Sequence, residues 1–317
     1  MASSDHARGE GEFVSGAVGI RVPASSANIG PGFDAMGLAL EIHDEIIAMV
    51  TEDAGVLVEV EGEGSGEVPL DERHLVAQAM NIAFEKMGVT PAGFVIKCRN
   101  AIPHGRGLGS SAAAIIGGIV IARELVVGGS DLLPDSEVLN LALSLENHPD
   151  NLSASLYGGF TVSWLESAHS AGSVCVNVHP DVIPIVVVPP HALETTKARG
   201  VLPETVPMYQ AVHNLSRAAL LVHAMSTDPN LLLPATDDAL HQYHRADIYP
   251  ETAQLLQQMR AQGVAAVASG AGPAVLILLN KAQTPDLNVL QTMLPVDWTI
   301  VAVPIDREGI RRVEIPT

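Results

Sequence analysis

The chain has 317 residues, of which 47% are hydrophobic, enough for one large or two ordinary domains with a sizeable core. Its formal net charge of −19 argues against a nucleic-acid partner, because binding phosphates requires clustered Lys and Arg side chains. The two cysteines, Cys98 and Cys175, lie far apart without metal-ligand spacing, which favours a reducing compartment and no disulfide framework.

The N-terminal residues 1–15 are polar and acidic, which predicts a disordered leader. They lack the charged and then apolar pattern of a secretion signal, and no apolar run in the chain reaches the length of a membrane span. We therefore expect a cytoplasmic protein without a membrane partner.

The rest of the chain alternates between strand and helix patterns. A strand is expected from residue 17 and passes into a loop over residues 23–34, and a helix over residues 71–88 is expected to begin at Asp71 as N-cap and to end at Gly88. Further strands are predicted over residues 44–50, 55–62, 93–98, 160–165, 174–178, 184–190 and 299–303, and further helices over 110–127, 135–147, 206–225 and 250–263. Strands come early and later mix with helices, which favours an α+β fold over a doubly wound sheet.

A glycine-rich segment, residues 103–113 (PHGRGLGSSAA), follows a predicted strand and opens a predicted helix. Gly105, Gly107 and Gly109 allow positive φ and a close approach to a ligand. The free N–H groups at a helix start form an anion site, where Ser110 and Ser111 add hydroxyl groups for a phosphate or Mg²⁺. The segment lacks the lysine of a Walker A loop and the spacing of a dinucleotide fingerprint, and a plain turn with a serine N-cap is the structural alternative.

This segment resembles the phosphate-binding motif of the GHMP small-molecule kinases, Pro-x-x-x-Gly-Leu-Gly-Ser-Ser-Ala. Residues 23–40 resemble the family's first motif, in particular that of homoserine kinases, and residues 269–278 resemble its C-terminal glycine-rich motif. The resemblance implies ATP and Mg²⁺ as cofactors and two α+β domains: a ribosomal-S5-like nucleotide-binding domain over residues 16–180 and a ferredoxin-like, substrate-side domain over residues 181–317. The residues implied at the nucleotide are Pro103, His104, Gly105, Arg106, Gly107, Leu108, Gly109, Ser110, Ser111, Ala112 and Ala113.

The resemblance also implies the reaction, transfer of the ATP γ-phosphate to the hydroxyl of L-homoserine in threonine biosynthesis. Homoserine is a zwitterion, so its site requires a carboxylate for the ammonium and guanidinium groups for the carboxylate. The matching substrate positions are Asn28, Asp34, His148, Thr195, Arg199 and Arg245. Asn28 would orient the hydroxyl, Arg199 would clamp the substrate in line, and Glu146 with Ser110 or Ser111 would hold Mg²⁺. No general base can be assigned.

Simpler interpretations stay open for these residues. Asn28 and Asp34 could stabilise a turn, His148 and Glu146 could be structural or solvated, and the arginines could lie on the surface. A kinase for another small alcohol and a non-catalytic nucleotide-binding sensor are the rival functions. Members of the family often form homodimers, an option that the sequence leaves open.

Overall fold

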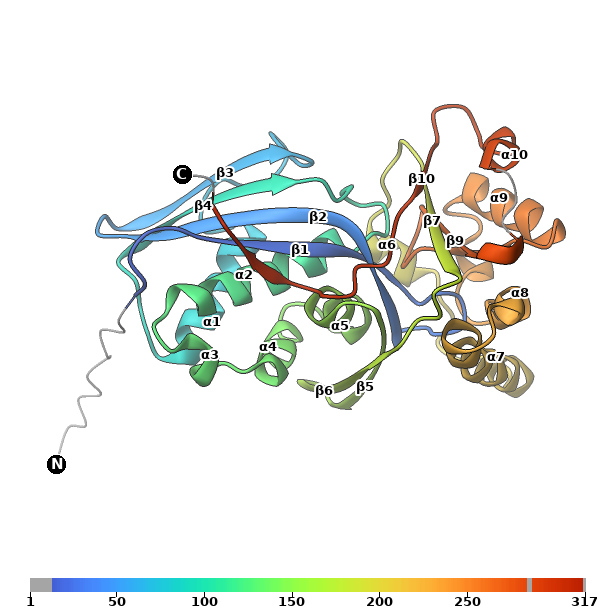
Figure 1. Ribbon diagram of the computed structural model, residues 1–317, viewed down its shortest axis with the longest axis horizontal. Coiled ribbons are helices and arrows are strands. Elements are labelled where there is room, and N and C mark those ends of the chain that lie inside the picture. The colour runs from blue at the N-terminus through green and yellow to red at the C-terminus, as the bar shows by residue number, and fades with distance from the viewer. Residues whose placement is uncertain (1–12, 284–286, 316–317) are drawn as a thin grey trace.

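The computed structural model describes residues 13–283 and 287–315, which form two sheets with helices packed on them (Figure 1). The mixture of largely antiparallel sheets and helices confirms the predicted α+β class. None of the helices in these residues is long and apolar enough to cross a membrane.

The larger sheet has the strand order β11-β1-β2-β4-β3, and β5 pairs with both β2 and β6 beside this path. Its pairs are antiparallel except β3–β4, which is parallel. The strands are β1 (Val18–Ala27), β2 (Met36–Thr51), β3 (Gly55–Gly62), β4 (Gly93–Asn100), β5 (Phe160–Ser167), β6 (Ser170–Val176) and β11 (Arg311–Val313).

Helices cover one face of this sheet (Figure 1). They are α1 (Leu75–Met87), α2 (Ser110–Leu125), α3 (Gly129–Leu132), α4 (Asp135–Ala142) and α5 (Pro149–Tyr157). The central helix, α2, is rich in small and β-branched residues and is buried along most of its length. A Cβ on its Gly118 would lie 2.5 Å from the Val76 carbonyl oxygen, so only glycine lets α1 approach this closely.

The smaller sheet has the order β10-β7-β9-β8 and is antiparallel throughout. Its strands are β7 (Val182–Val188), β8 (Ala265–Ala268), β9 (Val275–Asn280) and β10 (Thr299–Ala302). The accompanying helices are α6 (Thr195–Gly200), α7 (Met208–Ser226), η1 (Pro229–Leu231), α8 (Leu232–Ala235), η2 (Tyr243–Arg245), α9 (Pro250–Ala261), η3 (Lys281–Gln283) and α10 (Leu287–Thr292). Leu255 and Met259 of α9 join the apolar core on this sheet.

A continuous apolar core joins the two sheets. It contains Leu40 of β2, Val186 of β7 and Leu276 of β9, together with Ile29 and Leu108 from two connecting loops. The loops that carry the first motif and the glycine-rich segment are therefore anchored at the junction, because their buried side chains pack against both sheets.

The C-terminal segment crosses between the sheets. The Glu41 N–H donates to the Pro304 carbonyl at 2.9 Å, the Asp306 N–H donates to the Ala39 carbonyl at 3.1 Å, and β11 then pairs with β1 (Figure 1). The division of the chain into two domains near residue 180 stays a prediction. The C-terminal strand β11 lies in the same sheet as β1, so the end of the chain packs with its beginning.

Several predicted boundaries were wrong. The first strand continues through residues 23–27, because Ser25 and Ser26 are buried in the ladder with β2 although their polarity suggested a loop. The helix predicted from Asp71 begins at Leu75; His74 is its N-cap, whereas Asp71 bonds the N–H and guanidinium of Arg73 in a turn.

Two further segments differ from the prediction. The helix predicted over residues 135–147 ends at Ala142, and α5, which begins at Pro149, was not predicted. Residues 1–12 of the predicted leader lie outside the described residues. Phe13, at its end, is ordered against Val126 and Phe84, because its ring extends the apolar core.

Candidate active site

The glycine loop, residues 103–109, connects β4 to α2 and has the predicted positive φ angles at Gly105, Gly107 and Gly109 (66°, 77° and 73°). A Cβ on Gly107 would collide with the Ser269 carbonyl oxygen, and a Cβ on Gly109 would collide with the Ser25 hydroxyl. The glycines are therefore required partly because the first and last motifs pack directly against this loop, a reason that the sequence did not reveal.

The start of α2 has the free N–H groups that suit an anion. Gly109 is its N-cap and makes no side-chain cap, so the first N–H groups of the helix have no acceptor four residues earlier. They face a cavity of about 450 Å³, a size typical of small-molecule sites. Of the predicted nucleotide residues, those lining this cavity are Pro103, His104, Gly105, Gly107, Leu108, Gly109, Ser110, Ser111 and Ala112.

Arg106 and Ala113 do not line the cavity. The Arg106 guanidinium donates to the carbonyls of His104, Pro189 and Pro190 at 2.7, 3.2 and 2.8 Å, so it ties the loop to the segment after β7. Ala113 is completely buried in the junction core.

Asp44 and His74 are two further residues that line this cavity. Asp44 accepts hydrogen bonds from the N–H groups of Ala101 and Ile102 at 2.7 and 2.9 Å and so fixes the start of the glycine loop. Burial raises the pKa of Asp44 to about 6, and the two N–H groups oppose this shift. His74 accepts from the Val76 N–H through Nδ1, and burial lowers its pKa, so it is a neutral imidazole whose remaining proton is on Nε2.

On the substrate side, Asp34 and Arg199 form a two-pronged ion pair. Arg199 donates to the two Asp34 carboxylate oxygens at 2.7 and 3.1 Å, and the side chains are 38% and 31% exposed. Asn28 holds this loop: its Oδ1 accepts from the Asp34 N–H at 3.0 Å, and its Nδ2 donates to the Gly270 carbonyl at 2.8 Å. Asn28 and Asp34 both have positive φ, at 68° and 56°, so this loop is held in a sparsely populated conformation.

A second guanidinium lies beside the pair. Arg245 is 2% exposed and donates to the Ala198 carbonyl at 3.0 Å. The guanidinium carbons of Arg199 and Arg245 lie 5.4 and 5.8 Å from the centre of the Phe33 ring, within cation–π range. Thr195 is the first residue of α6, one helical turn before Arg199.

Glu146 and His148 connect the two halves of the site. His148 Nδ1 lies 2.9 Å from Glu146 Oε1, and its Nε2 lies 4.0 Å from Asp34. The hydrogen bond to Glu146 raises the pKa of His148 despite its burial. Because Glu146 also lines the cavity at the glycine loop, it links that cavity through His148 to Asp34 and Arg199.

Asp150 is a buried carboxyl that was given no role from sequence. Within the described part of the chain its one close donor is the Asn151 N–H, at 2.7 Å, and burial raises its pKa to about 7. Asp34 and Glu146 add to this shift by like-charge repulsion, so Asp150 belongs to the charge network of the site. The sequence feature that could have indicated Asp150 is its place directly after Pro149, because an acidic residue is favoured in the first turn of a helix.

The donor set fits Mg²⁺. Among residues 13–283 and 287–315, no three His, Cys, Asp or Glu side chains are grouped to hold a metal ion. Glu146, Ser110 and Ser111 all line the cavity, and their oxygens are the hard donors that Mg²⁺ takes when phosphates and waters complete its shell.

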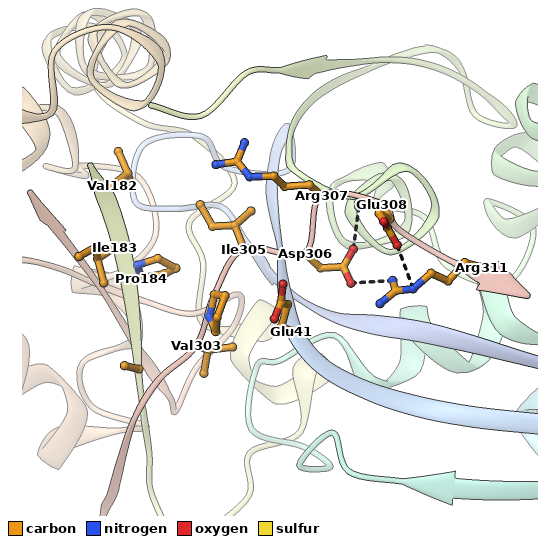
Figure 2. A pocket seen from close by; sticks show the side chains of 12 residues that line it. Glu41, Val182, Ile183, Pro184, Val303, Ile305, Asp306, Arg307, Glu308 and Arg311 are labelled. Atoms are coloured by element: carbon orange, nitrogen blue, oxygen red, sulfur yellow. Dashed lines mark hydrogen bonds and ion pairs between the residues drawn. The ribbon is translucent and has the colours of Figure 1, made fainter. Parts of the chain in front are cut away.

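A second cavity, of about 710 Å³, lies between β7 and the C-terminal segment (Figure 2). Arg311 pairs there with Asp306 and Glu308 at 2.8 and 3.1 Å, so both carboxylates already have a cationic partner. It lacks a helix start and the glycine loop, and we therefore place the active site in the cavity at α2.

Comparison with known proteins agrees with this geometry. Residues 74–159 match the GHMP kinase N-terminal domain and residues 216–287 the GHMP kinase C-terminal domain. The chain is 46% identical to a homoserine kinase of Streptomyces coelicolor over 94% of each chain, and 50% identical to that of Streptomyces avermitilis over 85% of this chain and 88% of the relative.

Solved structures show the same fold. A homoserine kinase from Cytophaga hutchinsonii has a TM-score of 0.80 at 23% identity, covering 95% of this chain and 99% of its own. A mevalonate diphosphate decarboxylase from Staphylococcus aureus has a TM-score of 0.69 at 18% identity, covering 94% and 98%. These likenesses confirm the predicted two-part GHMP fold, and the identity with the Streptomyces enzymes shows that the chain belongs to the homoserine kinase family of GHMP kinases.

Proposed function

We propose that this protein is a homoserine kinase, which transfers the γ-phosphoryl group of ATP to the hydroxyl of L-homoserine and releases ADP and O-phospho-L-homoserine. The observation that carries the proposal is the Asp34–Arg199 pair with Arg245 beside it, in a site continuous with the glycine loop. The names of the relatives support the same substrate.

The charges of this cluster are complementary to an amino acid zwitterion. The Asp34 carboxylate accepts the ammonium, and the guanidiniums of Arg199 and Arg245 take the carboxylate, each as a planar donor group. Mevalonate has a carboxylate but no ammonium and would leave Asp34 without a cationic ligand group. The cluster therefore favours homoserine over the other small alcohols that GHMP kinases phosphorylate.

Phosphoryl transfer requires positioning and charge stabilisation more than covalent catalysis. The N–H groups at the start of α2 hold the phosphates, and the glycine loop lets them approach the backbone. Glu146 and Ser110 or Ser111 would hold Mg²⁺, which neutralises charge on the phosphate oxygens when bound.

We assign Asn28 to orienting the substrate hydroxyl. An amide nitrogen carries two N–H groups, of which one donates to Gly270, and the second is directed to the hydroxyl oxygen in this proposal. The Asn28 carbonyl oxygen accepts from the Asp34 N–H, so it is not the proton acceptor. We assign no general base, and the hydroxyl proton leaves to the transferred phosphate.

The test is ADP release with Mg-ATP and L-homoserine, D-homoserine, L-serine, mevalonate or galactose. We expect turnover with L-homoserine alone among these alcohols. Turnover with a different alcohol and none with L-homoserine would overturn the substrate assignment but keep the kinase. ATP binding without any turnover would favour a non-catalytic sensor. The cytoplasmic location and the homodimer stay predictions, and sedimentation analysis would test the dimer.

A further inference from the structure

His241 is a fully buried histidine that neither the sequence nor the proposed reaction assigns. Its Nε2 lies 2.8 Å from the Gly30 carbonyl oxygen, and its Nδ1 lies 3.0 Å from Nη1 of Arg245. A carbonyl only accepts and a guanidinium only donates, so the proton is assigned to Nε2 and the lone pair to Nδ1. The imidazole is therefore neutral, in agreement with the lowering of its pKa by burial.

The surroundings hold this ring in one orientation. It stacks on Phe33 with 5.1 Å between centroids and an interplanar angle of 22°. The Asp238 carboxylate accepts from the N–H groups of His241 and Gln242 at 3.1 and 2.8 Å and so fixes the turn that carries the histidine. The imidazole thus connects the substrate loop, through Gly30 and Phe33, to the arginine that follows it by four residues.

We propose that His241 is a positioning residue of the amino-acid site, which acts through Arg245 and sets the place of that guanidinium relative to the Asp34–Arg199 pair. This role rests on the proposed homoserine kinase function. The guanidiniums of Arg199 and Arg245 both lie over the Phe33 ring and repel each other, and an arginine side chain without a partner has many rotamers. Arg245 therefore requires a fixed hydrogen-bond partner to stay in one place.

A neutral acceptor suits this task better than a carboxylate. The Nδ1 lone pair of His241 orients Arg245 without cancelling its positive charge, so the guanidinium keeps its attraction for the substrate carboxylate. An acidic residue at the same place would compete with the substrate for Arg245.

The experiment measures KM for L-homoserine, KM for ATP and kcat in three variants: His241→Leu, His241→Asn and, as a matched control, His179→Leu. Leucine removes both polar atoms, whereas asparagine keeps an acceptor where Nδ1 lies. The control histidine is a half-buried residue that caps the Asp181 N–H outside the site. Each variant is also made in an Arg245→Gln background, and thermal melting checks its fold.

We expect His241→Leu to raise KM for L-homoserine about tenfold or more with KM for ATP changed less than about twofold, and His241→Asn to recover most of the loss. In the Arg245→Gln background His241→Leu should add almost nothing, because the two residues act as one unit. If His241→Leu does not fold, His241→Asn decides: near-normal KM for L-homoserine supports the role, and parallel increases in KM for L-homoserine and KM for ATP overturn it.

Other outcomes are equally decisive. Parallel increases in both KM values, or full additivity with Arg245→Gln, would mean that His241 only stabilises the fold, and the positioning role would be wrong. A wild-type enzyme that binds ATP but does not phosphorylate L-homoserine would overturn the proposed function and this role together. Normal wild-type turnover with an unaffected His241→Leu variant would overturn the role alone.

Discussion

Replacing Arg199 by alanine should separate stability from activity. The guanidinium donates to Asp34 at 2.7 and 3.1 Å, but both side chains are about one-third exposed, and such ion pairs contribute about 0–1 kcal/mol to folding. Losing a guanidinium that binds a substrate carboxylate costs about 2–4 kcal/mol of transition-state binding. At 1.4 kcal/mol per factor of ten, kcat/KM for L-homoserine should fall by about 30- to 700-fold.

The chain offers a matched control for this prediction. Arg21 binds Glu45 with two N–H groups at 2.6 and 3.2 Å, and these side chains are 39% and 27% exposed, outside the cavity at α2. Coupled measurement of ADP release gives kcat/KM, and thermal melting gives stability. Arg21→Ala should match Arg199→Ala in melting temperature but keep wild-type kinetics. The assignment of Arg199 to the substrate carboxylate would be refuted if the two variants had the same kinetic constants. It would also be refuted if Arg199→Ala raised KM for ATP as much as KM for L-homoserine.

Three further changes test other parts of the structure. Gly109→Ala should abolish ATP binding in calorimetry, because positive φ costs alanine about 1–2 kcal/mol and the new Cβ collides with Ser25 at the start of α2. Asp150, whose folded pKa is about 7, holds a proton that the unfolded chain releases near pH 4, so wild-type stability should fall as pH rises from about 4 to 7. The free energy of unfolding of Asp150→Asn, measured with urea, should therefore equal that of wild type near pH 4 and exceed it near pH 8 by at most about 4 kcal/mol. Equal free energies of unfolding near pH 8 would contradict this. Asp306→Ala should destabilise the protein by about 1–3 kcal/mol in urea unfolding, because it leaves two backbone N–H groups without their acceptor, while Arg311 keeps its ion pair with Glu308.

The sequence predicted the local parts of this site. Glycines at positions 105, 107 and 109 predicted positive φ, and the apolar run after Ser110 predicted a buried helix with a free N-terminus. These features depend on backbone conformation and short-range periodicity, which the residue types encode directly. Family resemblance added which loops face the ligands.

Several of the contacts that the sequence missed involve partners that are distant along the chain. Arg106 was predicted at the nucleotide, but two of its three carbonyl acceptors, Pro189 and Pro190, lie more than 80 residues away in the chain. Asn28 joins Gly270 across 242 residues, and the neighbours of His241 include Gly30, 211 residues earlier. Composition and spacing do not reveal such pairs, because the sequence does not show whether a histidine or asparagine bonds to solvent or to a distant carbonyl.

Those distant pairs also join the loops that carry the three sequence motifs. Ser269 Oγ lies 2.6 Å from the Gly107 carbonyl oxygen and 2.8 Å from Ser26 Oγ, so the glycine loop, the first motif and the last motif form one hydrogen-bonded unit. The Gly270 carbonyl in that unit accepts from Asn28 of the first motif, while Gly270 itself lines the cavity at α2. A substitution inside this unit should therefore impair ATP and homoserine binding together. A substitution of Arg199, which contacts the unit through Asp34 and the Phe33 ring, should impair homoserine binding alone, because Arg199 does not line the cavity at α2.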